Sequence, residues 1–238
     1  MKTNHFFLDF DGTIATVDVV DLVLENFAGS KWQDIEKEWA SGKIGSRECL
    51  TRQVELVQAS PKEVEKLLST VQLDPYFIPF LEKAEELGVL VTIVSDGFDL
   101  LIEQVLRQNL VKNSGLLKAL PILSNRLARN GNGFKTIFTP ETACNHGCAN
   151  CKEGHIKRLT AFDDNVFFVG DGWSDRYAAQ AVHMTFAKGR LLEYCVEKEI
   201  DHIAYNDFQK IKEWLTENYP MLKKMNFMRN NRREEKES

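Results

Sequence analysis

The first residues of the chain form a short apolar run, and helical spacing follows it. Residues 4–8 (Asn-His-Phe-Phe-Leu) lead into Asp-Phe-Asp-Gly-Thr, which predicts a buried strand followed by a polar loop. From residue 14 to residue 74, apolar residues recur three and four positions apart, which predicts helices with no strand between them. Ser60, Pro61 and Glu63 mark one helix start, with serine at the cap and proline in the first turn.

Strand and helix patterns alternate in the rest of the chain. Residues 89–94 are a β-branched run, the pattern of a strand buried on both faces of a parallel sheet. Residues 166–169 predict a second such strand, and residues 121–138 predict a hairpin with a Gly- and Asn-rich turn. Further helices are expected over residues 77–87, 99–110, 152–160 and 175–181, and from residues 191 and 207, with short strands at 184–187 and 203–205. This alternation indicates an α/β fold with a doubly wound (Rossmann-like) parallel sheet.

The same patterns divide the chain into a core, an insert and a tail. We expect an α/β core over residues 1–13 and 75–220 and a small inserted helical cap over residues 14–74. Residues 221–238 are rich in Lys, Arg, Asn and Glu, and we expect this charged tail to be mobile. A chain of 238 residues is long enough for a core domain with a small second unit.

Composition and charge argue against several classes of partner. Hydrophobic residues make up 43% and charged residues 27% of the chain, which is ordinary for a globular protein. The formal net charge of -5 provides no basic surplus, so we expect no nucleic-acid partner. The first apolar run is soon broken by Asp9 and Asp11, and no stretch approaches the roughly 18 apolar residues of a membrane helix. We therefore expect a cytoplasmic protein with no membrane partner, and the oligomeric state stays open.

Three predicted strands end in acidic or hydroxyl residues. Asp9 and Asp11 follow the first strand, and Ser95 and Asp171 follow two others. Because the carboxyl ends of parallel strands share one edge of a sheet, where ligands bind, we expect these side chains to converge. Neighbouring carboxylates repel each other unless a cation lies between them, and carboxylate oxygens suit Mg²⁺. Such an ion would also attract a phosphate group, and Gly12 leaves the loop backbone open to phosphate oxygens.

These motifs resemble those of the haloacid dehalogenase superfamily of phosphatases. Residues 9–13 (Asp-Phe-Asp-Gly-Thr) resemble the first motif, Ser95 the second, and residues 170–175 (Gly-Asp-Gly-Trp-Ser-Asp) the fourth. The third motif is a lysine at a helix start before the last of these strands. Lys152 fits best, and Lys157, one to two turns further into the helix, is the alternative.

The resemblance implies a Mg²⁺-dependent phosphomonoesterase that hydrolyses a small phosphorylated metabolite. It implies that Asp9 attacks phosphorus and becomes an aspartyl-phosphate, while Asp11 protonates the leaving oxygen and later activates water. Lys152 would neutralise charge on Asp9 and on the transferring group. The implied phosphate-binding residues are Gly12, Ser95, Gly97 and Lys152, and the implied metal ligands are Asp9, Asp11, Asp171 and Asp175.

Within that family, the chain resembles the branch that holds phosphoserine phosphatase and the methionine-salvage phosphatase acting on 2-hydroxy-3-keto-5-methylthiopentenyl-1-phosphate. Residues 124–127 (Ser-Asn-Arg-Leu), before a Gly-rich hairpin, resemble the former. A cysteine-bearing loop before Lys152, Phe-Ala at residues 186–187 and the segment 202–208 resemble the latter, which we favour. Residues 95–97 read Ser-Asp-Gly where phosphoserine phosphatases typically carry Ser-Gly-Gly.

The cysteine-bearing loop is a second chemical feature. Cys144, Cys148 and Cys151 crowd around His146, among five cysteines in all, which favours a reducing compartment over a disulfide framework. A structural zinc ion, reduced loop cysteines and a redox pair all stay open, because the usual paired-knuckle spacing is absent. Two other functions also stay open. One is a phosphotransferase, which differs from the phosphatase only in that an alcohol, and not water, accepts the phosphoryl group. The other is a non-enzymatic zinc-bearing interaction module.

Overall fold

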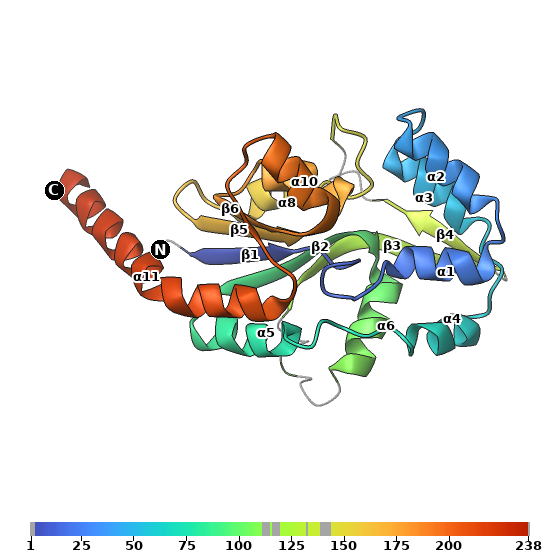
Figure 1. The fold of residues 1–238 in the computed structure, drawn as a ribbon, viewed down its shortest axis with the longest axis horizontal. Helices are drawn as coiled ribbons and strands as arrows, with labels where there is room; N and C mark the ends of the chain where they lie inside the picture. Colours follow the sequence, from blue (N-terminus) through green and yellow to red (C-terminus); the bar gives the residue numbers. More distant parts are fainter. Residues whose placement is uncertain (1–2, 111–114, 116–119, 132, 139–143, 238) are drawn as a thin grey trace.

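A sheet with helices on both faces organises the computed structural model (Figure 1). The structure describes residues 3–110, 115, 120–131, 133–138 and 144–237, and side chains as far as residue 223. The strands are β1 (Asn4–Leu8), β2 (Leu90–Phe98), β3 (Ile122–Asn130), β4 (Gly133–Ile137), β5 (Asn165–Gly170), β6 (Met184–Ala187) and β7 (His202–Ala204). The helices are α1 (Val19–Phe27), α2 (Trp32–Ala40), α3 (Ser46–Val54), α4 (Pro61–Leu68), α5 (Phe77–Glu86), α6 (Asp99–Asn109), α8 (Lys152–Leu159), α9 (Arg176–Ala179), α10 (Gly189–Glu197) and α11 (Phe208–Glu237), with a 3₁₀ turn η3 (Trp173–Asp175).

The strand order confirms the doubly wound α/β fold. The sheet runs β4-β3-β2-β1-β5-β6-β7, and each neighbouring pair is parallel except β3 and β4. β1 lies between β2 and β5, so the carboxyl ends of these three strands share one edge of the sheet. β3 and β4 form the expected antiparallel hairpin, and Gly131 in its turn has a φ of +60°.

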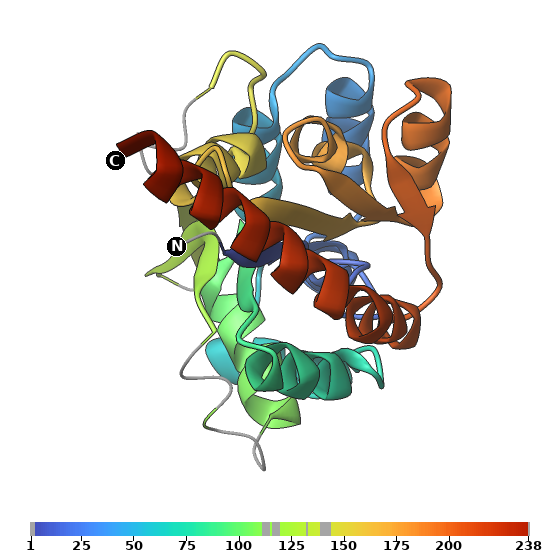
Figure 2. The same ribbon diagram turned by 90° about the vertical axis from the view of Figure 1, so that its left-hand side faces the viewer.

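The side chains of β1 alternate between two hydrophobic layers. Phe6 and Leu8 belong to the cluster that includes residues of α5, α6 and α11. Phe7 belongs to the cluster on the opposite face, which includes residues of α8, α9 and α10 (Figures 1 and 2). The ring of Phe6 stacks on Phe167 with 4.6 Å between the ring centroids. Each fully buried phenylalanine contributes about 2 kcal/mol, so both layers hold the end of β1 in place.

Residues 14–74, between β1 and β2, contain helices α1 to α4, as the periodicity predicts. The capping box at the start of α4 is confirmed, since Ser60 Oγ accepts from Glu63 N and Glu63 Oε2 accepts from Ser60 N. An isolated antiparallel bridge between Ala15 and Leu73 brings the two ends of this segment together.

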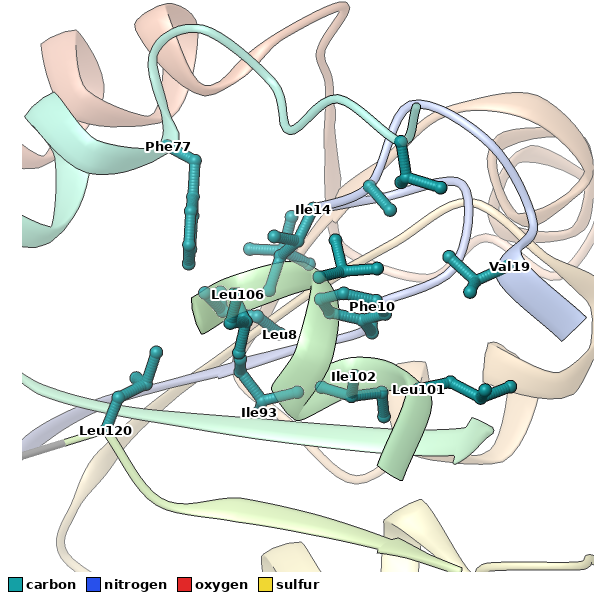
Figure 3. Packing of buried hydrophobic residues seen from close by; sticks show 14 of the residues in the cluster. Leu8, Phe10, Ile14, Val19, Phe77, Ile93, Leu101, Ile102, Leu106 and Leu120 are labelled. Carbon is teal, nitrogen blue, oxygen red and sulfur yellow. The ribbon is translucent and has the colours of Figure 1, made fainter. Parts of the chain in front are cut away.

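The inserted segment shares its hydrophobic packing with the sheet. Phe10, Ile14 and Val19 lie in one cluster with Leu101 and Ile102 of α6 (Figure 3). The division into a core and a cap at residues 14–74 stays a prediction.

Two elements extend further than the sequence pattern predicts. β2 runs to Phe98, so Ser95 and Gly97 lie within the strand, beside a register shift between Val94 and Phe98 in its pairing with β3. Helix α11 continues to Glu237, so residues 221–237 have helical backbone, and the expected mobility of residues 221–238 stays a prediction. Among the described residues, no helix combines the length and the apolar character needed to cross a membrane.

Candidate active site

The ends of β1, β2 and β5 bring the predicted site residues to one edge of the sheet. Asp9 directly follows β1, and its backbone N–H donates to Val169 O of β5 at 2.9 Å. Asp171 directly follows β5, and Ser95 lies near the end of β2. Asp9 and Ser95 are buried, with 4% and 0% of their surface exposed. The predicted convergence is therefore present.

Lys152 forms a buried ion pair with Asp9. Its Nζ lies 2.7 Å from Asp9 Oδ1 and 2.6 Å from Asp175 Oδ1. Lys152 is the first residue of α8, where Cys151 is the N-cap residue. Lys157, later in the same helix, is exposed and pairs with half-buried Glu153. Of the two candidate lysines, the structure therefore places Lys152 at the site.

Asp171 approaches the first loop closely. Thr13 Oγ1 donates to Asp171 Oδ1 at 2.7 Å, which orients that carboxylate. Gly12 has a φ of +68°, and a Cβ at this position would lie 2.5 Å from Asp171 Oδ2. Only glycine combines this backbone conformation with the space that the carboxylate needs.

Asp11 lies on the other side of the site, with Ser95 and Gly97. Its Oδ1 accepts from Val19 N at 2.9 Å, and its Oδ2 accepts from Ser95 Oγ at 3.3 Å. Gly97 N donates to Ser95 Oγ at 2.9 Å, and a Cβ on Gly97 would lie 2.7 Å from Asp11 Oδ2. The end of β2 thus places a hydroxyl and a backbone amide beside Asp11, the kind of donors that bind phosphate oxygens.

The residues present fit a hard divalent cation. One oxygen each of Asp9, Asp171 and Asp175 lies within 4.8 Å of the others, and oxygen donors suit Mg²⁺. The carboxylate of Asp11 is outside this group, so its expected role as a metal ligand stays a prediction. Asp175 Oδ2 accepts from the amides of Asp171 and Gly172, and its Oδ1 from Lys152. Asp175 therefore holds the loop after β5, and its expected role as a direct or water-mediated metal ligand stays a prediction.

Burial and neighbouring charges shift the pKa values of the site residues. Burial raises the pKa of Asp9 well above its usual value, Asp175 raises it further, and Lys152 opposes both. Burial lowers the pKa of Lys152, but Asp175 and Asp9 outweigh burial, so the ammonium form is strongly favoured. Burial also raises the pKa of Asp171. A divalent cation among these carboxylates would favour their charged forms.

A cavity of about 280 Å³ opens above Asp9 and Lys152. Its lining includes residues of the inserted helices that sequence reasoning did not place. These residues are Asp18, Val20, Asp21, Glu36, Trp39, Ser46, Cys49, Leu50 and Gln53. Asp96 and Arg190 line it from the core, and buried Asp96 Oδ1 has no hydrogen-bond partner among the described groups. The cavity volume suits a small metabolite.

Asn150 is a positioning residue that the sequence did not reveal. Its Nδ2 donates to Ser95 O at 2.8 Å and to Leu123 O at 2.9 Å. Its Oδ1 lies 2.6 Å from Nε2 of His155 in α8. Asn150 therefore links the end of β2 to the helix that carries Lys152. A polar residue in a cysteine-rich loop carries no sequence signal for this role.

Comparison with known proteins finds similarity along most of the chain. A family model described as haloacid dehalogenase-like hydrolase matches residues 6–180. The bifunctional enzyme MtnB/MtnX of Bacillus licheniformis is 28% identical over 231 residues, which cover 91% of this chain and 52% of that protein. The chain thus spans about half of that relative. A Bacillus pumilus protein named 2-hydroxy-3-keto-5-methylthiopentenyl-1-phosphate phosphatase is 24% identical over 230 residues, covering 91% of this chain and 96% of the relative.

Solved structures support the same fold. A structure described as a phospho-aspartyl intermediate analogue of phosphoserine phosphatase superposes with a TM-score of 0.66. It covers 90% of this chain and 99% of that protein, at 19% identity. Likeness at this level of identity shows the fold alone.

Proposed function

The chain belongs to the haloacid dehalogenase-like hydrolase family, and from this premise we propose that it is a Mg²⁺-dependent phosphomonoesterase acting on a small phosphorylated metabolite. The observation that carries the proposal is the buried ion pair between Lys152 and Asp9, at the floor of the cavity and beside Asp171. A buried carboxylate with one oxygen held by an ammonium group is oriented for attack with its other oxygen.

In the first half of the reaction, an Asp9 oxygen attacks phosphorus. A bond forms between that oxygen and phosphorus as the bond from phosphorus to the substrate oxygen breaks. Asp11 gives its proton to the leaving oxygen, so an alcohol departs. Burial raises the pKa of Asp11 well above its usual value, which favours the protonated form that this step needs.

In the second half, water hydrolyses the aspartyl-phosphate. Asp11, now ionised, accepts a proton from the attacking water. Inorganic phosphate leaves and the Asp9 carboxylate is regenerated. Ser95 Oγ and the amide of Gly97 hold phosphate oxygens, and Lys152 balances the charge that develops on Asp9 and the phosphoryl group.

Asp9, Asp171 and, through water, Asp175 would hold Mg²⁺, which supplies charge neutralisation for the phosphoryl group. Without a cation, the carboxylates outnumber Lys152 and would repel a phosphate dianion. The requirement for a divalent ion follows from this imbalance of charge.

The methionine-salvage enol phosphate is our first candidate substrate. The full-length relatives support it, because this chain covers 96% and 97% of the Bacillus pumilus and Exiguobacterium phosphatases named for 2-hydroxy-3-keto-5-methylthiopentenyl-1-phosphate. The apolar part of the cavity lining, Val20, Trp39 and Leu50, offers contacts to a methylthio chain.

Phosphoserine is the second candidate, and the acidic side of the cavity favours it. Asp18, Asp21 and Glu36 all line the cavity, where carboxylates would attract the ammonium group of an amino acid phosphate. Burial and the neighbouring Asp18 raise the pKa of Asp21 to about 7. A cationic substrate group would favour the ionised form of this residue.

Hydrolysis of a panel of phosphomonoesters tests the proposal. The panel contains both candidates and is assayed with Mg²⁺, with EDTA, and with Asp9→Asn. We expect Mg²⁺-dependent phosphate release from one compound that EDTA and the mutation both abolish. Full activity in Asp9→Asn would contradict the mechanism.

The same assay separates the alternatives. An added acceptor alcohol that captures the phosphoryl group would identify a phosphotransferase. Absence of turnover across the panel in a folded, Mg²⁺-loaded protein would favour the non-enzymatic interaction module. The cytoplasmic location and the absence of nucleic-acid and membrane partners stay predictions.

A further inference from the structure

A cluster of four metal-ligating side chains lies outside the carboxylate site. Cys144, His146, Cys148 and Cys151 each offer one ligand atom, and these atoms lie within 4.8 Å of one another. Three thiols and one imidazole are a donor set for tetrahedral zinc. The cysteines are all free. A disulfide would use only two of the sulfurs, whereas a single tetrahedral ion uses all four donors.

Backbone amides lie against two of the sulfurs. Cys151 Sγ accepts from Gly154 N at 3.3 Å, in the first turn of helix α8. The backbone amides of Cys148 and His146 face Cys144. Amide donors of this kind orient ligating groups.

The imidazole is also held in place. Nδ1 of His146 lies 3.5 Å from Oε2 of Glu153, and the His146 ring stacks on Tyr177 with 3.8 Å between the ring centroids. A carboxylate beside a ligating histidine fixes the orientation of the ring. Glu153 and Tyr177 thus hold the His146 ring from two sides.

We propose that Cys144, His146, Cys148 and Cys151 bind one structural zinc ion. Four protein donors close the coordination shell, which is typical of structural zinc and leaves no open position for a substrate. Sulfur donors select zinc over Mg²⁺, and the all-oxygen carboxylate group selects Mg²⁺. The two metal sites therefore differ in their chemistry as well as in their residues.

The site lies where the loop joins two parts of the active site. Cys151 directly precedes Lys152, so a bound ion anchors the end of α8 that carries the lysine. On its other side, the loop contacts the start of α3. Ser46 N donates to Gly147 O at 3.1 Å, and Arg47 Nε donates to Cys148 O at 3.3 Å. The zinc ion therefore positions Lys152 and fixes the edge of the inserted helices, a role that rests on the proposed function.

Metal content tests the site without any assay of activity. The full chain, purified under reducing conditions after expression with zinc, is expected to carry one zinc ion per chain by elemental mass spectrometry. Cys148→Ser should lose it, while Cys195→Ala should keep it, because Cys195 is a buried cysteine outside the cluster. Full zinc content in Cys148→Ser would overturn the proposal.

A second measurement covers the case in which Cys148→Ser does not fold. The metal-stripped wild-type chain is titrated with Co²⁺, and we expect thiolate-to-cobalt charge transfer and tetrahedral d–d absorption that zinc abolishes. Glu153→Gln should weaken zinc binding roughly tenfold, because the carboxylate orients His146. The absence of a charge-transfer band would contradict the proposed zinc site. So would a disulfide among these cysteines in protein that was purified under reducing conditions.

The positioning role has its own readout. With saturating Mg²⁺, removal of zinc should lower kcat roughly tenfold with little change in KM. Cys148→His, which keeps a ligating group, should retain zinc and kcat. In a Lys152→Met background, zinc removal should have no further effect on kcat, because the group that it positions is gone. An equal fall in kcat in the wild-type and Lys152→Met backgrounds would contradict the positioning role. The proposals of zinc binding and of phosphatase activity would still stand.

Discussion

Lys152 Nζ lies 2.7 Å from Asp9 Oδ1, and both side chains are almost fully buried. Asp9 comes from the end of β1 and Lys152 from the start of α8, so the fold brings together two segments that are far apart in the sequence. A buried ion pair is costly to form and costly to break. Under the proposed mechanism, this pair gives the Asp9 nucleophile the adjacent positive charge that it needs.

Replacing Asp9 by asparagine should abolish turnover. The amide cannot attack phosphorus, so we expect kcat to fall by at least about a thousandfold, measured as Mg²⁺-dependent phosphate release. The fold should survive, because the amide is nearly isosteric with the carboxylate. Asp34→Asn, at an exposed surface pair with Lys37, is the matched control and should keep wild-type kcat.

Replacing Lys152 by methionine should impair both activity and stability. The change leaves Asp9 and Asp175 buried without their cation, so we expect a loss of roughly 3–5 kcal/mol in the free energy of unfolding and a fall in kcat of about a hundredfold or more. Urea denaturation and steady-state kinetics measure the two effects.

Lys157→Met provides the comparison for that change. Lys157 pairs with Glu153 at the surface, and such pairs are worth less than about 1 kcal/mol. A larger loss of activity in Lys157→Met than in Lys152→Met would reverse the assignment of the site lysine.

The sheet and its edge could be predicted because apolar runs followed by acidic residues carry a strong signal. Phe6 to Leu8 are buried on both faces of the sheet, and a parallel sheet brings the ends of such strands together. Lys152 fits the third motif of the resembled family better than Lys157, because Lys152 stands at the start of its helix. The structure places Lys152 beside Asp9 at that edge.

The lining of the cavity could not be predicted, because it depends on how the inserted helices turn towards the sheet. The sequence pattern does not distinguish Asp18, Asp21 and Glu36 from other polar residues in segments that form amphipathic helices. Their place in the cavity follows from the packing of α1 and α2 against other elements, which local periodicity does not encode. Asn150 was missed for the same reason, since its partners Ser95 and Leu123 are remote in sequence.

Gly12→Ala should reduce activity through Asp171. The added Cβ would lie 2.5 Å from Asp171 Oδ2, so the carboxylate must move away from its place beside Asp9. We expect a weaker apparent affinity for Mg²⁺ and a fall in kcat of roughly tenfold or more, measured by Mg²⁺ titration of activity.

Gly29→Ala separates this clash from backbone strain. Gly29 has a φ of +64°, close to the +68° of Gly12, but a Cβ there would meet nothing within 4 Å. Both variants should lose about 1 kcal/mol of stability from the left-handed conformation. Only Gly12→Ala should lose activity, and equal activities would show that the contact with Asp171 does not matter.

His5 should make the fold sensitive to acid. Burial lowers the pKa of His5 from 6.5 to about 4, although Asp164 acts in the opposite sense. The folded state therefore holds the neutral ring, which packs on Phe7 and contacts Thr92 Oγ1. Because the folded pKa is depressed, this contribution is present above pH 6.5 and is lost as the pH falls towards 4, by roughly 3 kcal/mol in all.

His5→Gln removes the titrating ring and tests this dependence. Thermal unfolding between pH 7 and pH 4 should show a smaller loss of stability in His5→Gln than in the wild type. His202→Gln, on strand β7 at the edge of the sheet, controls for the loss of one imidazole and should follow the wild-type profile. A profile of His5→Gln parallel to the wild type over this range would show that other groups, and not the buried ring on β1, cause the acid sensitivity.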